Sequence, residues 1–152
     1  MHISAKVDYA LRALLFLYTT EEESLPCAVL ANNQKIPQKY LETIMSSLKR
    51  GQIVASHRGN SGGYYLARPG NSISIADVIR AVDGPLAEIN GHKPEDMDYF
   101  GSALHLKTVW IALRASMRSI LETTTLADVA DGHLPQNVSD LAKNPDSWTR
   151  RN

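Results

Sequence analysis

The stretch IPQKYLETIMSSLKRGQIVASHRGNSGGYYLAR, residues 36–68, decides the fold expected for this chain. Its first half predicts a helix from about Pro37 to Arg50, because apolar residues recur at helical spacing and Gly51 follows the last turn. Its second half has two β-prone runs on either side of a glycine-rich turn, which predicts a β-hairpin. The apolar stripe of the helix comprises Tyr40, Leu41, Ile44, Met45 and Leu48.

The segments around this stretch complete a mainly α fold with one small β-hairpin. Apolar periodicity predicts a helix over residues 4–18, a short helix that opens at Ser24 or Pro26, and a helix that starts after Ser74. The order of helix, short helix, turn, helix and glycine-tipped hairpin is that of a winged helix-turn-helix domain. This domain is expected to cover residues 1–84.

A long helix is expected over about residues 102–124, followed by a short turn that ends near residue 131. Its apolar positions repeat in steps of three and four, which is typical of a helix that packs along another helix. The candidate dimer seam comprises Leu106, Trp110, Leu113, Met117 and Ile120. Residues 85–101 are expected to form a loop, and residues 132–152, which are polar and contain Pro135 and Pro145, a loose and flexible tail.

The charge of the chain is zero overall, but it is unevenly distributed. Residues 34–68 carry six basic residues against one acidic residue, whereas residues 69–102 carry two basic against six acidic. A concentrated basic segment suits phosphate binding, because each neutralised phosphate releases condensed counterions. Taken alone, the same segment is equally consistent with an ordinary solvated face.

The basic segment supplies the candidate DNA-binding residues. In a helix-turn-helix the second helix of the pair enters the major groove, while a hairpin with an arginine near its tip suits the adjacent minor groove. Lys39 and Glu42 could each be ordinary surface residues, and Tyr40 could belong to the core. The exposed face of residues 38–46 offers amide, ammonium, phenol, carboxylate and hydroxyl groups that can read bases or hold phosphates, and Arg58 stands near the hairpin tip.

Five segments of the chain strongly resemble the Rrf-type family of bacterial transcriptional regulators, to which IscR, NsrR and CymR belong. They are VDYALRAL (7–14), IPQKYLE (36–42), LKRGQIV (48–54), SHRGNSGGY (56–64) and IADVIRAVDG (75–84). The similarity spans about residues 2–130, and the arginine–glycine hairpin before Gly62, Gly63 and Tyr64 is its most specific part. The resemblance implies a homodimer in which the long helix crosses to the partner and the recognition helix and wing bind double-stranded DNA. The DNA-binding candidates that it implies are Gln38, Lys39, Tyr40, Glu42 and Thr43 on the recognition helix and Arg58, Gly59, Asn60 and Ser61 on the wing.

The chain departs from the iron–sulfur members of that family. Those members carry three cysteines in the loop before the long helix, whereas residues 85–101 contain none and the whole chain has one cysteine, Cys27. Clusters need several thiolates, so no cofactor and no metal site is expected. Cys27 is interpreted as a packed thiol rather than a sensor, and Asp8, His92 and His105 as scattered polar residues.

The loop and the start of the long helix offer a candidate effector pocket for a small molecule. Aromatic and polar side chains in one region can line such a pocket, although core packing and dimer contacts explain them equally well. The residues concerned are Met97, Tyr99, Phe100, His105 and Trp110.

The function expected from these patterns and from the resemblance is a sequence-specific DNA-binding regulator, a repressor or dual regulator that binds a pseudo-palindromic operator as a homodimer. The alternative is a winged-helix module that binds a protein partner without DNA. No nucleophile–base set, phosphate loop or metal-spacing motif points to an enzyme. The N-terminus lacks the order of a signal peptide and no apolar run suits a membrane span, so a cytoplasmic location is expected.

Overall fold

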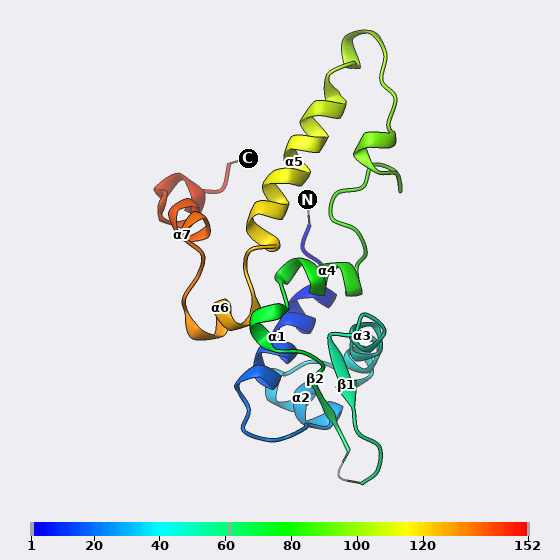
Figure 1. Ribbon diagram of the computed structural model, residues 1–152, viewed down its shortest axis with the longest axis vertical. Helices are drawn as coiled ribbons and strands as arrows, with labels where there is room; N and C mark the ends of the chain where they lie inside the picture. Colours follow the sequence, from blue (N-terminus) through cyan, green and yellow to red (C-terminus); the bar gives the residue numbers. More distant parts are fainter. Residues whose placement is uncertain (1, 61, 152) are drawn as a thin grey trace.

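The computed structural model describes residues 2–60 and 62–151 (Figure 1). Its elements are α1 (Ala5–Thr19), α2 (Cys27–Gln34), α3 (Gln38–Arg50), β1 (Val54–Ser56), β2 (Tyr64–Leu66), η1 (Gly70–Ser72), α4 (Ile75–Val82), η2 (Pro94–Asp96), η3 (Gly101–Ala103), α5 (Leu106–Leu121), α6 (Leu126–Asp131), α7 (Gln136–Lys143) and η4 (Pro145–Trp148). The expected fold class, mainly α with a small hairpin arranged as a winged helix-turn-helix, is confirmed.

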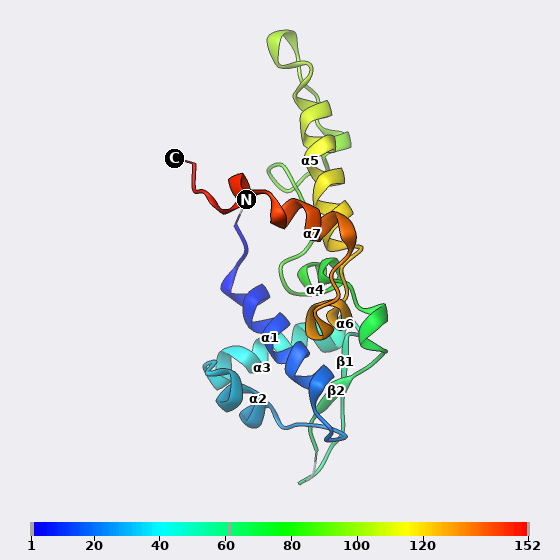
Figure 2. The same cartoon turned by 90° about the vertical axis from the view of Figure 1, so that its left-hand side faces the viewer.

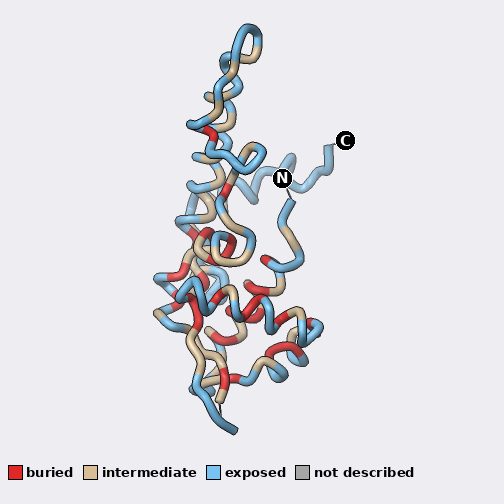
Figure 3. The backbone as a smooth tube through the Cα atoms, turned by 90° about the vertical axis from the view of Figure 1, so that its right-hand side faces the viewer, coloured by how far each residue is buried: buried red, intermediate tan, exposed pale blue. Residues whose placement is uncertain are grey.

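The core surrounds α1, which packs against α2, α3, α4 and α6. Buried residues are concentrated in the part of the molecule that α1 and these helices form (Figure 3). Four of the five residues of the expected stripe of α3 are buried; the fifth, Tyr40, is half-buried. The largest fully buried side chains are those of Leu14, Leu30, Leu41, Ile44, Met45, Leu48, Ile53, Ile73 and Leu126.

Two capping boxes fix the helices that connect the winged domain to the C-terminal part. The predicted start of α4 is confirmed: the Ser74 hydroxyl accepts from the backbone N–H of Asp77, whose carboxylate accepts from the backbone N–H of Ser74. Thr125 and Asp128 repeat this arrangement at the start of α6. Ser74 and Thr125 also face each other in an antiparallel bridge, which anchors the end of α5 to the winged domain.

The hairpin is a wing of two antiparallel strands in which Val54 pairs with Leu66 and Ser56 with Tyr64. Leu25, in the linker before α2, forms an isolated antiparallel bridge with Tyr64 through two backbone hydrogen bonds, of 2.9 and 2.7 Å. Gly63 makes this close approach feasible, because a Cβ there would lie 2.5 Å from the Leu25 backbone. The bridge therefore ties the wing to the helix-turn-helix.

Several boundaries differ from those expected. The long helix begins at Leu106 rather than near residue 102, because the chain first makes a separate 3₁₀ turn, Gly101–Ala103. In the turn after α2, Lys35 adopts the left-handed conformation (φ 54°). Gln52, rather than Gly51, is left-handed after α3, while a Cβ on Gly51 would lie 2.9 Å from the Ala81 Cβ. Gly51 therefore serves the packing of α3 on α4.

The C-terminal segment is not the irregular tail that its prolines suggested. Pro135 precedes the helix α7, Gln136–Lys143, and Pro145 opens a 3₁₀ turn, so the prolines start helical segments here instead of preventing them. Asn137 Nδ2 donates to the Ser119 carbonyl of α5 over 2.7 Å, and α7 lies beside α5 in Figure 2. No residue of α7 is buried.

Helix α5 projects from the winged domain, and the wing tip lies at the opposite end of the molecule (Figure 1). None of its sixteen residues is buried, although Val109, Ile111 and Leu113 are large and apolar and are 53, 39 and 45% exposed. Within residues 2–60 and 62–151, no helix combines the length and apolar character needed to cross a bilayer.

Candidate nucleic-acid interface

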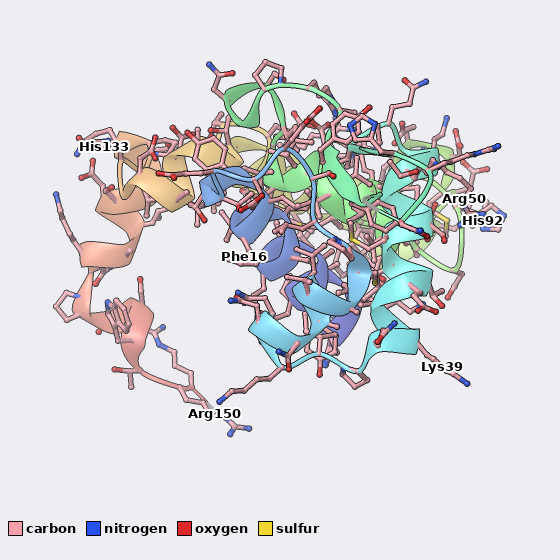
Figure 4. The ribbon with its side chains drawn as sticks, turned by 90° about the horizontal axis from the view of Figure 1, so that it is seen from below. Phe16, Lys39, Arg50, His92, His133 and Arg150 are labelled. Carbon is pink, nitrogen blue, oxygen red and sulfur yellow. The ribbon has the colours of Figure 1, made fainter. Side chains whose placement is uncertain are left out.

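The solvent face of α3 carries four of the five candidate DNA-binding residues on that helix, namely Gln38, Lys39, Glu42 and Thr43. Gln38 Nε2 donates to Glu42 Oε1 over 3.1 Å, and the Thr43 hydroxyl donates to the Lys39 carbonyl over 3.3 Å. Lys39, at the start of the helix, extends away from the body of the molecule (Figure 4). This face therefore offers amide, carboxylate and ammonium groups to the solvent.

Tyr40 lies at the edge of the core. It is half-buried, and its ring packs edge-on against Tyr9 with centroids 5.7 Å apart and an interplanar angle of 86°. The Arg12 guanidinium lies 5.5 Å from the centroid of the Tyr9 ring. Tyr40 thus has a structural role in joining α3 to α1, and only part of it is accessible to a partner.

Basic residues at both ends of α3 extend this surface. Lys35 lies just before the helix, Lys49 and Arg50 in its last turn, and all three are exposed. Lys49 Nζ donates to the Ser56 hydroxyl of β1 over 2.6 Å, which links the helix to the wing. The sequence patterns counted these residues in the basic segment, but only the fold shows that they share a surface with the candidates on α3.

Arg68, the last residue of the basic segment, forms its polar contacts with other residues of the winged domain. Its guanidinium donates to the Ser72 carbonyl over 2.7 Å and to Asp77 Oδ2 over 3.4 Å. By contrast, the part of the chain that the structure describes places no carboxylate within ion-pairing distance of Lys35, Lys39, Lys49, Arg50 or Arg58. Five of the six cations are therefore available to an anionic partner.

The wing tip presents Arg58, Gly59 and Asn60, all exposed, while Ser61 lies outside the described residues. Gly59 has φ 105°, and its carbonyl accepts from the Gly62 N–H over 2.9 Å to close the turn. At the base of the tip His57 stacks on Tyr65 with ring centroids 4.5 Å apart, and its Nε2 lies 3.7 Å from Glu23 Oε1. Neighbouring contacts thus fix the base from which Arg58 projects.

The single thiol, Cys27, lies at the start of α2 and outside residues 85–101. Burial, and secondarily the Glu42 carboxylate, raise the pKa of Cys27 to about 11. Burial also raises the pKa of Tyr64, with Cys27 and Glu42 adding to it. The described residues include no group of three or more His, Cys, Asp or Glu side chains placed to hold a metal ion.

The candidate effector residues are only partly brought together. Tyr99 and Trp110 line a cavity of about 520 Å³ between residues 87–99 and α5, and Trp110 Nε1 donates to the Tyr99 hydroxyl over 3.1 Å. Met97, Phe100 and His105 do not line it, and Phe100 is 82% exposed. Four of the five residues of the candidate dimer seam line the same cavity: Leu106, Trp110, Leu113 and Met117.

Comparison with known proteins agrees with this geometry. Residues 3–132 match the Rrf2 family, described as an iron-dependent transcriptional regulator. The chain belongs to the Rrf2 family of transcriptional regulators. A Mycobacterium tuberculosis protein named as an HTH-type transcriptional regulator is 50% identical over 143 residues, covering 93% of this chain and 89% of its own. The HTH-type transcriptional regulator CymR of Bacillus subtilis is 30% identical over 132 residues, covering 86% and 90%.

Solved structures of related proteins have the same architecture as this Rrf2-family chain. The structure of CymR, the global cysteine regulator of Bacillus subtilis, superposes with a TM-score of 0.71 at 27% identity and covers 87% of this chain and 98% of its own. The T. potens IscR structure has a TM-score of 0.68 at 26% identity, covering 92% and 96%. The named relatives are transcriptional regulators, a non-enzymatic role.

The iron named in the family description finds no matching set of donors in this chain. An iron–sulfur cluster needs several thiolates, or histidines in place of some of them. The one cysteine lies in α2 with a raised pKa, whereas residues 85–101 supply only carboxylates and His92. The residues that the structure describes therefore do not fit an iron–sulfur cluster.

Proposed function

We propose that this protein is a cluster-free regulator that binds a pseudo-palindromic DNA operator as a homodimer and represses transcription. One observation carries the proposal: five cations without an intramolecular ion pair among the described residues surround the exposed face of α3 and the wing. Phosphate groups of duplex DNA are the partners that such a surface suits best.

Within this proposal, α3 reads the major groove. Gln38, Lys39, Glu42 and Thr43 meet base edges or phosphates from its first two turns, the part of a recognition helix that lies deepest in the groove. The Gln38–Glu42 hydrogen bond holds both side chains in one arrangement, so that the carboxylate is aimed toward a base amino group. Arg58 at the wing tip reaches the adjacent minor groove.

The exposed apolar side chains of α5 support the homodimer in this proposal. A helix with no buried residue but several large apolar side chains needs a partner surface. A two-fold axis would place two copies of α3 about 34 Å apart, or a multiple of that, along one face of the duplex.

The experiment starts from genome-wide selection of DNA fragments with the purified protein, followed by titration of the selected duplex at several salt concentrations. We expect Arg58→Ala to weaken binding and to lower the salt slope by about one phosphate per subunit. The control is Arg150→Ala, which removes the same charge from the C-terminal tail, far from α3 (Figure 4), and is expected to leave binding unchanged.

Equal binding by Arg58→Ala and wild type would remove the wing from the interface. Salt-insensitive or absent binding to every duplex, together with a stable protein partner in a pull-down, would favour a winged-helix interaction module instead.

A further inference from the structure

Two adjoining cavities lie between the segment that follows α4 and one side of α5. The larger, of about 520 Å³, is mainly apolar, with Leu106, Trp110, Leu113 and Met117 along its helical wall. The smaller, of about 260 Å³, has a basic wall formed by Arg80, Lys93, Arg114 and Arg118. Ala87 and Glu88 line both, so the two cavities meet at this part of the loop.

The register of α5 places the apolar and basic walls side by side. Leu113 and Met117 line the larger cavity, and the residues that follow each of them, Arg114 and Arg118, line the smaller one. Successive residues of an α-helix are rotated by about 100°, so each pair presents one apolar and one cationic side chain to adjacent sectors. A single bound molecule can therefore contact both walls.

The smaller cavity has an excess of positive charge. Its lining contains four cations against two carboxylates, Glu88 and Glu95. Glu95 is paired with Arg114 at 2.6 Å, and Arg80 and Arg118 share Glu122. Lys93 has no ion-pair partner among the described residues. Arg80 also pairs with Asp77, so Lys93 is the cation of this lining that a bound carboxylate beside Lys93 and Arg118 would supply with an ion pair.

The loop that separates the cavities is held in an unfavourable conformation. Ala87 has φ 58°, in the left-handed region that costs a residue with a Cβ about 1–2 kcal/mol. Leu86 and Pro94 on either side are buried, which fixes the loop in place. Backbone strain of this kind gathers at ligand sites. On the opposite side, the Trp110–Tyr99 hydrogen bond places a polar hydroxyl in an otherwise apolar wall.

We propose that these cavities bind one small amphipathic carboxylate, with its aromatic or branched aliphatic body against Leu113 and Met117 and its carboxylate beside Lys93 and Arg118. The volume of the larger cavity lies within the range of about 300–1,000 Å³ that is usual for small-molecule sites. As an effector this ligand rests on the proposed regulatory function. Binding of the carboxylate is measured without DNA, so that the ligand site and the proposed DNA-binding function can each fail independently of the other.

The test uses the full chain carrying Trp148→Phe, which leaves Trp110 as the single tryptophan and its fluorescence as the signal. The probes are 4-phenylbutyrate and its uncharged analogue 4-phenylbutan-1-ol, at the same protein concentration. We expect quenching by both probes, with the carboxylate binding about fivefold more tightly, as two partly exposed charge contacts allow.

Lys93→Gln combined with Arg118→Gln should remove the preference for the carboxylate without weakening binding of the alcohol. The matched control, Lys143→Gln with Arg150→Gln, changes the same charge on the tail and should keep the preference. Met117→Trp adds a tryptophan, so its probe binding is measured by isothermal titration calorimetry; the larger side chain should fill the larger cavity and abolish binding of both probes.

Two results would overturn the proposal. The first is a wild-type dimer that binds neither probe and that becomes a monomer when Met117→Trp is introduced. A second copy of the chain would then fill the cavity in place of a ligand. The second is equal affinity for acid and alcohol in the wild type, because the basic wall would then have no role in recognition.

Discussion

Replacing Gly63 by alanine should loosen the wing. A Cβ at this position would lie 2.5, 2.7 and 2.8 Å from the backbone C, O and N of Leu25, where carbon–carbon contacts are ordinarily about 3.5–4.0 Å. The neighbour is backbone inside a hydrogen-bonded bridge, so no side-chain rotation can relieve the overlap. The strand and the linker must therefore separate by about 1 Å.

The expected magnitude follows from two terms. Overpacking of a close contact costs about 1–3 kcal/mol. Stretching the two hydrogen bonds between Leu25 and Tyr64 adds up to about 1 kcal/mol for each bond. A loss of about 3 kcal/mol in the free energy of unfolding corresponds to a fall of about 6–12 °C in Tm for a chain of this length. Affinity for the selected duplex should fall as well, because the bridge positions the wing.

The assay is thermal and urea unfolding at one fixed protein concentration, since dimerisation makes Tm depend on concentration. The comparison variant is Gly132→Ala, where φ is 72° but a Cβ would meet nothing within 4 Å. That substitution has only a conformational cost, about 1 kcal/mol. A Tm shift for Gly63→Ala no larger than that for Gly132→Ala would refute the steric reasoning.

Two further predictions concern the thiol and a strained turn. Because the pKa of Cys27 is raised from 9.0 to about 11, its thiolate fraction at pH 8 should be about 100-fold below that of an unperturbed thiol, and folded protein should react correspondingly slowly with iodoacetamide. Labelling of folded protein as fast as that of urea-unfolded protein at pH 8 would contradict the expected slow reaction. Because the thiolate is disfavoured in the folded state, the contribution of this thiol to stability is present below about pH 9 and is lost as the pH rises through 11. Gln52→Gly should raise the free energy of unfolding by about 0.5–1 kcal/mol, because glycine relieves the left-handed strain at φ 57° for a smaller entropic loss. The urea midpoint measures it, with an unchanged or lower midpoint counting against the prediction.

The resemblance to a family, the helical periodicity and the glycine-rich hairpin were enough to predict the winged domain from the sequence. Local rules sufficed where the signal is local: α4 starts after Ser74 as expected, with Ser74 as its N-cap. They failed in the tail, where Pro135 and Pro145 suggested irregular structure but lie at positions that helices tolerate. Proline interrupts a helix when it lies in the interior but is tolerated at the start, and the neighbouring residues decide where the helix starts.

The candidate DNA-binding residues on α3 could likewise be named in advance, because an amphipathic helix divides its own surface into buried and exposed sectors. The tertiary structure alone decided which charges are available. Arg68 belongs to the same basic segment as Arg58, yet its contacts with Ser72 and Asp77 engage it inside the domain.

What the sequence by itself determined is therefore the order of elements and the face that each helix buries, since both depend on spacing along the chain. What only the tertiary structure decided is the set of contacts between distant segments: the Leu25 bridge that fixes the wing, and the loop that brings Ala87 and Lys93 against α5. Spacing cannot specify such contacts, because they depend on how separately formed elements pack together.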